Sequence, residues 1–177
     1  MRIKTKLCLL ATGLMLSAPA MAEQGSMAAS AAPACPAPIA PAGALAPWAR
    51  PAPLAAGADG AHAPTVTLGR AAQLALLPTP SLHFLLPPAK SGEATSHGGV
   101  LSLDIAKTGT YRIALSAAAW LDVVGQDGAQ RSIAHAHGPD CSGIRKMVDF
   151  TLKPGHYTVQ ISSSAVAQIR LLAIALP

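Results

Sequence analysis

The sequence predicts an all-β protein, an antiparallel β-sandwich or jelly roll of about eight or nine strands, preceded by an arm rich in Ala and Pro. Two observations predict this fold class. Short stretches in the second half of the chain alternate apolar and polar residues, and turns containing Gly or Pro separate them. The chain of 177 residues is also long enough to bury one proper core.

Strands are expected where apolar side chains recur at every second residue or form a short run. Only Arg70–Leu77 competes as a short helix. In chain order, the expected strands are Val66–Leu68, Ala72–Leu76, Leu82–Leu86, Leu101–Ile105, Tyr111–Leu115, Val148–Leu152, Tyr157–Ile161 and Ile169–Ile174.

Two of the expected turns have the same sequence pattern. A Lys-x-Gly turn leads into a strand that starts with Tyr, first at Lys107–Tyr111 and again 46 residues later at Lys153–Tyr157. A Tyr at such a position can bury its ring while its hydroxyl bonds nearby backbone. The repetition predicts two equivalent corners of a sandwich.

The first residues have the layout of an export signal. Three of the first six residues are basic, and the apolar stretch Leu7–Ala18 is too short to span a membrane. Ala20-Met21-Ala22 is a small-x-small cleavage signal, so the mature chain is expected to start at Glu23. The sequence therefore divides into a signal peptide (1–22), an Ala/Pro-rich extended arm (23–64) and a β-sandwich domain (65–177). The expected location is the periplasm, with secretion as the alternative.

Removing the signal peptide lowers the net charge. Three of the 13 Lys and Arg residues leave with it, so ten remain against eight acids and the charge falls from +5 to +2. This balance gives little support to binding of nucleic acids, and the few aromatic residues argue against a stacking platform. No membrane insertion is expected after cleavage, and the sequence identifies no partner.

The cysteines predict a disulfide. The chain has three, and Cys8 leaves with the signal peptide. An even number of cysteines in an oxidising compartment indicates pairing, so Cys35 is expected to bond to Cys141.

The segment from His135 to Cys141 has the highest density of reactive side chains. If His135 and His137 lie on a strand, both imidazoles are on one face and could bind Cu, Zn or Fe, with His156 and Asp140 completing the shell. No other cofactor is expected. The alternative is two histidines beside a Gly-Pro turn that bond only to backbone or water. Once oxidised, Cys141 cannot be a thiolate ligand.

Three basic residues form a second candidate site. Arg131, Arg145 and Lys146 could contact an anion in a turn, or they could form a solvated charged edge that guards an outer strand.

Sequence motifs of enzymes give no support for catalysis. The chain has no Gly-x-Ser-x-Gly elbow, no Gly-rich phosphate loop and no pair of carboxylates placed for acid–base work. The sequence favours a non-enzymatic binding or structural protein and leaves a metal-binding protein as the alternative.

Two resemblances accompany these patterns. The strand–Lys-Pro-Gly-x-Tyr–strand pattern resembles the β-sandwich modules called prepeptidase C-terminal domains, over roughly residues 99–175. The stretches Ala119–Val124, His135–Cys141 and Gly143–Phe150 resemble small uncharacterised exported proteins of sphingomonad-type bacteria, some of which carry the label homogentisate dioxygenase. That label implies a metal-dependent dioxygenase. Enzymes of that family, however, are far longer and bind iron through two His and one Glu, and this chain has no His-x-x-x-x-x-Glu pattern.

Overall fold

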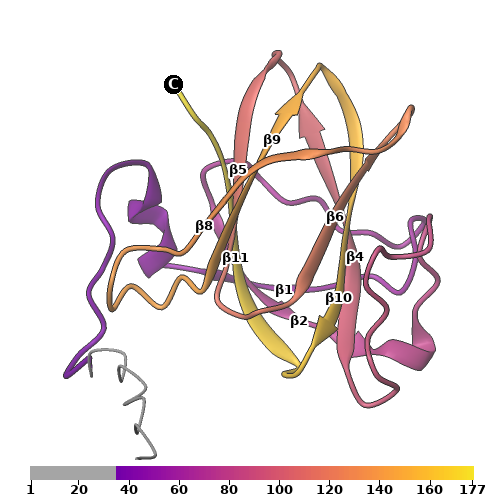
Figure 1. The fold of residues 1–177 in the computed structure, drawn as a ribbon, viewed down its shortest axis with the longest axis horizontal. Coiled ribbons are helices and arrows are strands. Elements are labelled where there is room, and N and C mark those ends of the chain that lie inside the picture. Colours follow the sequence, from indigo (N-terminus) through magenta and orange to yellow (C-terminus); the bar gives the residue numbers. More distant parts are fainter. Residues whose placement is uncertain (1–34) are drawn as a thin grey trace, which may run out of the picture. The chain divides into compact units, whose positions relative to one another are not determined.

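Two β-sheets packed face to face form the part of the chain that the structure describes, residues 35–177 (Figure 1). The structure is a computed structural model. The apolar side chains between the sheets form one continuous core, which includes Leu103 from one sheet and Phe150 from the other. The predicted all-β sandwich is confirmed. The expected signal peptide, and the first part of the expected arm, lie outside the described residues.

The larger sheet has six strands in the order β1-β2-β11-β5-β9-β8. All its neighbouring strands are antiparallel except β1 and β2, which are parallel. The strands are β1 (Ala52–Ala55), β2 (Ala71–Ala75), β5 (Gly109–Leu115), β8 (Ser132–Ala136), β9 (Lys146–Leu152) and β11 (Gln168–Ala175).

The smaller sheet has five strands in the order β3-β4-β10-β6-β7, all antiparallel. Two short 3-10 helices, η1 (Gly43–Ala49) and η2 (Thr79–Ser81), lie outside the sheets. The strands are β3 (Leu77–Pro78), β4 (His97–Ile105), β6 (Trp120–Gly125), β7 (Gly128–Ala129) and β10 (Gly155–Ser164).

The two Lys-x-Gly turns are equivalent corners, as their sequences predict. The first turn joins β4 to β5 and the second joins β9 to β10, so each crosses from one sheet to the other. In each corner the Tyr hydroxyl donates a hydrogen bond to the Lys carbonyl four residues earlier, at 2.6 Å for Tyr111 and 3.0 Å for Tyr157.

The N-terminal part of the sandwich differs from the sequence-based prediction. Residues 52–55, within the segment assigned to the arm, form β1, so the sheet begins before Thr65. Residues 66–68 are not a strand: the isolated bridge to β4 is made by Thr65, the Val66 N–H donates to the Ser102 carbonyl at 2.8 Å, and Gly69 has a φ of +75. Residues 82–86, flanked by prolines, are not a strand, whereas 71–75 is a strand rather than a helix.

The arm is fastened to the larger sheet from Cys35 onward. Cys35 and Cys141 lie at disulfide-bonding distance with their Cα atoms 5.4 Å apart, as predicted. Ile39 N–H donates to the Cys141 carbonyl at 2.8 Å. Trp48, which is 1% exposed, packs in a second apolar cluster on the larger sheet and donates to the Ser142 carbonyl at 3.0 Å. These contacts hold the loop 137–145 between β8 and β9.

Candidate functional site

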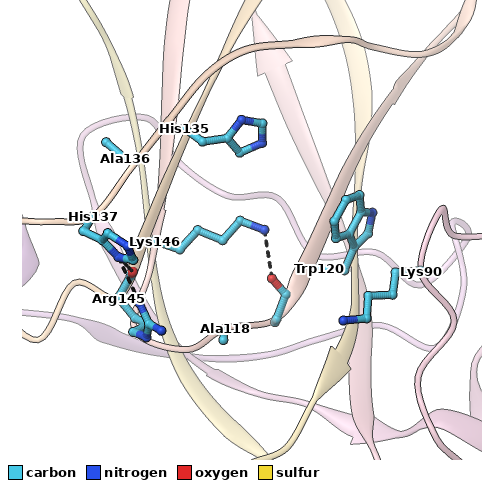
Figure 2. A pocket seen from close by; sticks show the side chains of 9 residues that line it. Lys90, Ala118, Trp120, His135, Ala136, His137, Arg145 and Lys146 are labelled. Atoms are coloured by element: carbon cyan, nitrogen blue, oxygen red, sulfur yellow. Dashed lines mark hydrogen bonds between the residues drawn. The ribbon is translucent and has the colours of Figure 1, made fainter. Parts of the chain in front are cut away.

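A pocket of about 380 Å³ contains both histidines of the His-x-His segment and two of the three predicted anion contacts (Figure 2). We name it the β6–β8 pocket. It is lined by Lys90, Ala118, Ala119, Trp120, His135, Ala136, His137, Arg145 and Lys146. It lies between β8, a terminal strand of the larger sheet, and the first residue of β6 in the smaller sheet.

Strand β9 places Lys146 between the two sheets. Val148 and Phe150 follow at alternate positions and are buried in the core between the sheets. A strand repeats every second residue, so Lys146 has the same inward orientation at the end of the strand. An apolar residue would be usual at such a position, which makes this lysine the most informative feature of the pocket.

The Lys146 side chain extends across the pocket, so that its ammonium group reaches the smaller sheet (Figure 2). Its Nζ donates to the Ala119 carbonyl at 3.2 Å and lies 5.0 Å from the centre of the Trp120 ring. Burial lowers the pKa of Lys146 below its ordinary value of 10.5, and nearby Asp122 opposes this shift. The charge is thus partly desolvated before any ligand arrives.

Arg145 and His137 form a contact at the pocket edge. One guanidinium nitrogen of Arg145 lies 2.9 Å from His137 Nδ1, and the Arg145 carbonyl lies 3.0 Å from the same atom. Either contact engages His137 Nδ1 and leaves Nε2 as its other polar atom. The Arg145 N–H donates to the Leu115 carbonyl at 2.8 Å, which fixes this residue to β5.

The opposite wall consists of Trp120 and the segment that carries Lys90. The Trp120 indole N–H donates to one Asp122 oxygen at 3.0 Å, and the Ala89 N–H donates to the other at 3.2 Å. The Lys90 carbonyl accepts a hydrogen bond from buried Ser162 at 2.8 Å. Asp122, the acid nearest the pocket, therefore holds Trp120 and the segment of Lys90 in place.

The charges in the pocket are of one sign. Lys90, Arg145 and Lys146 bring three cations, while no Asp or Glu is among the lining residues. Like charges held around one concave surface reinforce each other's potential. The pocket is suited to an anion, and Trp120 with the three alanines supplies apolar surface beside the charges.

The structure does not bring His156 to the other histidines. His156 lies on β10 directly opposite Asp104 on β4, and its Nδ1 is 2.7 Å from the Asp104 carboxylate. It lines a different pocket, near the β9–β10 corner. Residues 35–177 contain no group of three or more His, Cys, Asp or Glu side chains placed to hold a metal ion. The Cys141 sulfur faces Cys35.

Arg131 lies outside the β6–β8 pocket, exposed between β7 and β8. Of the three cations in the predicted anion site, Arg145 and Lys146 thus line one pocket. The prediction did not include Lys90 and Trp120, which reach the same pocket from distant parts of the chain. The position of Lys146 could have been predicted from the sequence. It precedes Val148, Phe150 and Leu152 in the same alternation, so its charged side chain is expected to point inward with theirs.

Within residues 35–177, no helix is long and apolar enough to cross a membrane. The chain matches no protein-family model, and no curated protein is significantly similar to it.

Proposed function

We propose that the protein is an exported, non-enzymatic β-sandwich that binds the anionic group of a ligand in the β6–β8 pocket, in the periplasm. The observation that carries the proposal is the inward-facing Lys146, flanked by Arg145 and Lys90 with no acid in the lining. A carboxylate, sulfate or phosphate group would exchange water for hydrogen bonds from these donors.

The same charges favour an anion over a metal ion. A divalent cation held by His135 and His137 would sit beside Arg145 and Lys146, and no carboxylate lines the pocket to offset that repulsion. His137 Nδ1 is already engaged by Arg145. Binding by the two histidines alone is the competing hypothesis, and metal titration separates it from ours.

Binding rather than catalysis fits the lining of this pocket. It combines cations, imidazoles, one indole and three alanines, and contains no hydroxyl, thiol or carboxylate side chain. Such a set attracts and orients an anion, while the nucleophile–base–acid constellations of common hydrolases need groups that this lining does not supply.

Calorimetric titration of the exported chain with benzoate and with sulfate tests the proposal. Replacing Lys146 with Met, or Arg145 with Gln, is expected to weaken binding about tenfold or more, since a hydrogen bond to a charged group contributes about 1.5–3 kcal/mol. Arg131→Gln removes a nearby cation outside the pocket and is the matched control, with unchanged affinity expected.

The fold is checked in the same experiment by thermal unfolding. Lys146→Met removes a half-buried charge, so its Tm is expected to equal or exceed that of the parent protein. No saturable anion binding by the parent protein would contradict the proposal. Zn²⁺ or Cu²⁺ binding that is lost on replacing His135 and His137 with Ala would support the metal hypothesis instead.

A further inference from the structure

Strand β8 is an open edge of the larger sheet. It is the terminal strand, paired only with β9, and four of its five residues are exposed. Ile133 is 57% exposed there. Its outer backbone N–H and C=O groups are available to another extended chain.

The other three terminal strands in residues 35–177 are very short or contain a proline. β1 contains Pro53, β3 is only Leu77–Pro78, and β7 is only Gly128–Ala129. Very short edge strands and edge prolines are the usual defences against strand addition. β8 has five residues, no proline and no Lys, Arg, Asp or Glu, so among the terminal strands of the described residues it alone lacks these two defences, and its register to β9 shifts between Ser132 and Ala134.

The open edge borders the β6–β8 pocket. His135 pairs with Val148, whose side chain is in the core, so His135 faces the space between the sheets and lines the pocket. Ala134 has the opposite orientation, whereas Ala136, at the end of the strand, also lines the pocket. A strand laid along β8 would place every second side chain on the pocket side, beside His135 and toward Arg145 and Lys146.

We propose that the ligand is an acidic peptide segment of another protein, which adds a strand to β8 and directs Glu or Asp side chains into the β6–β8 pocket. This inference rests on the proposed function and specifies its partner. Main-chain hydrogen bonds supply affinity in this mode of recognition, and alternate side chains supply specificity.

Charge favours an acidic segment over a second copy of this chain. Residues 128–139 contain Arg131, His135 and His137 and no acid. Pairing two β8 edges would bring two basic pockets close together, with no acid on either strand between them. An acidic peptide neutralises the same charges.

The test uses two short peptides of alternating Glu and Val residues, titrated into the exported chain. In the second peptide, every backbone nitrogen is methylated, which keeps every charge and side chain but removes the hydrogen-bond donors of both edges. We expect the first peptide to bind about tenfold more tightly, since the second forfeits several hydrogen bonds. We also expect it to slow hydrogen exchange at the β8 amides that do not bond to β9. Arg145→Gln should weaken binding of both peptides.

The possible outcomes separate this inference from the proposed function. Equal binding of the two peptides, or no protection of β8 amides, would refute strand addition while leaving the anion site intact. Benzoate binding without peptide binding would do the same. Failure of benzoate, sulfate and both peptides would overturn the proposed function as well. Dimerisation through β8, seen as protection that depends on protein concentration, would assign the edge to a second copy.

Discussion

At the residue scale, Lys146 carries most of the proposed function. It occupies an inward position of β9 and is half-buried against Trp120, which lowers its pKa. A hydrophobic residue would suit the fold better at this position. Its presence is understandable if a ligand anion compensates for the partial desolvation of the ammonium group.

The lowered pKa of Lys146 gives a pH-dependent prediction. Anion affinity should be complete below the pKa of Lys146 and fall as the pH rises through it, starting below the ordinary value of 10.5. In Lys146→Arg the guanidinium stays charged, so this loss should disappear. Benzoate titrations at several pH values measure the difference between the two proteins.

The remaining titratable groups near the pocket serve as an internal control. Lys90, Asp122, His135 and His137 are present in both proteins, so their titration cancels in the comparison. Identical pH profiles would show that Lys146 does not contact the anion. The stability of the fold changes with pH in the opposite direction. Because the pKa of Lys146 is lowered in the folded protein, the unfolded chain keeps this proton at a pH where the folded chain has lost it. The free energy of unfolding therefore rises with pH over this range.

At the element scale, the arm and its disulfide control the loop between β8 and β9. That loop carries His137 and Arg145, and it is tied to the arm through Cys35–Cys141 and the Trp48 hydrogen bond. The arm therefore acts on the pocket through the loop without lining it.

Loss of the disulfide should affect stability more than binding. The bond closes a sequence separation of 106 residues. Replacing both cysteines with Ala should lower the free energy of unfolding by about 2–4 kcal/mol, chiefly by freeing the unfolded chain. Denaturant unfolding measures this, and the parent protein under reducing conditions should behave like the double variant. Two free thiols in unreduced protein comprising residues 23–177 would contradict the pairing.

The sequence predicted long strands better than short ones. β4, β5, β9, β10 and β11 show a clear alternation or apolar run, and each appears close to its predicted position. β1 has a proline and only four residues, so its pairing with β2 depends on tertiary contacts that no local pattern reveals. Residues 82–86 have the right composition for a strand, but the prolines around them remove the backbone donors that pairing needs.

The candidate site was only partly predictable for the same reason. Arg145 and Lys146 are adjacent in sequence and near His137, so a local reading could group them. Lys90 reaches the pocket because Ser162 and Asp122 fix its segment, which are contacts across long sequence separations. His156 was included in the predicted metal site only because it is a histidine, and the fold places it in another pocket.

At the scale of the whole sandwich, the pocket is a consequence of how the two sheets end. β8 is the last strand of one sheet, and the two-residue β7 leaves the first part of β6 uncovered in the other. The gap at this border exposes both the inward-facing Lys146 and the open edge of β8. A binding site can arise there without disturbing the core.

The most direct test is an NMR titration of isotope-labelled protein comprising residues 23–177 with benzoate. Saturable shifts of backbone amides are expected to cluster at residues 118–120, 135–137 and 145–146, which line the β6–β8 pocket. Lys146→Met should raise the benzoate concentration needed for these shifts about tenfold or more, with the amides far from the pocket unchanged. Shifts centred instead on the His156 pocket, at residues 125–127 and 153–157, or no saturable shifts at all, would contradict the assignment of the β6–β8 pocket as the anion site.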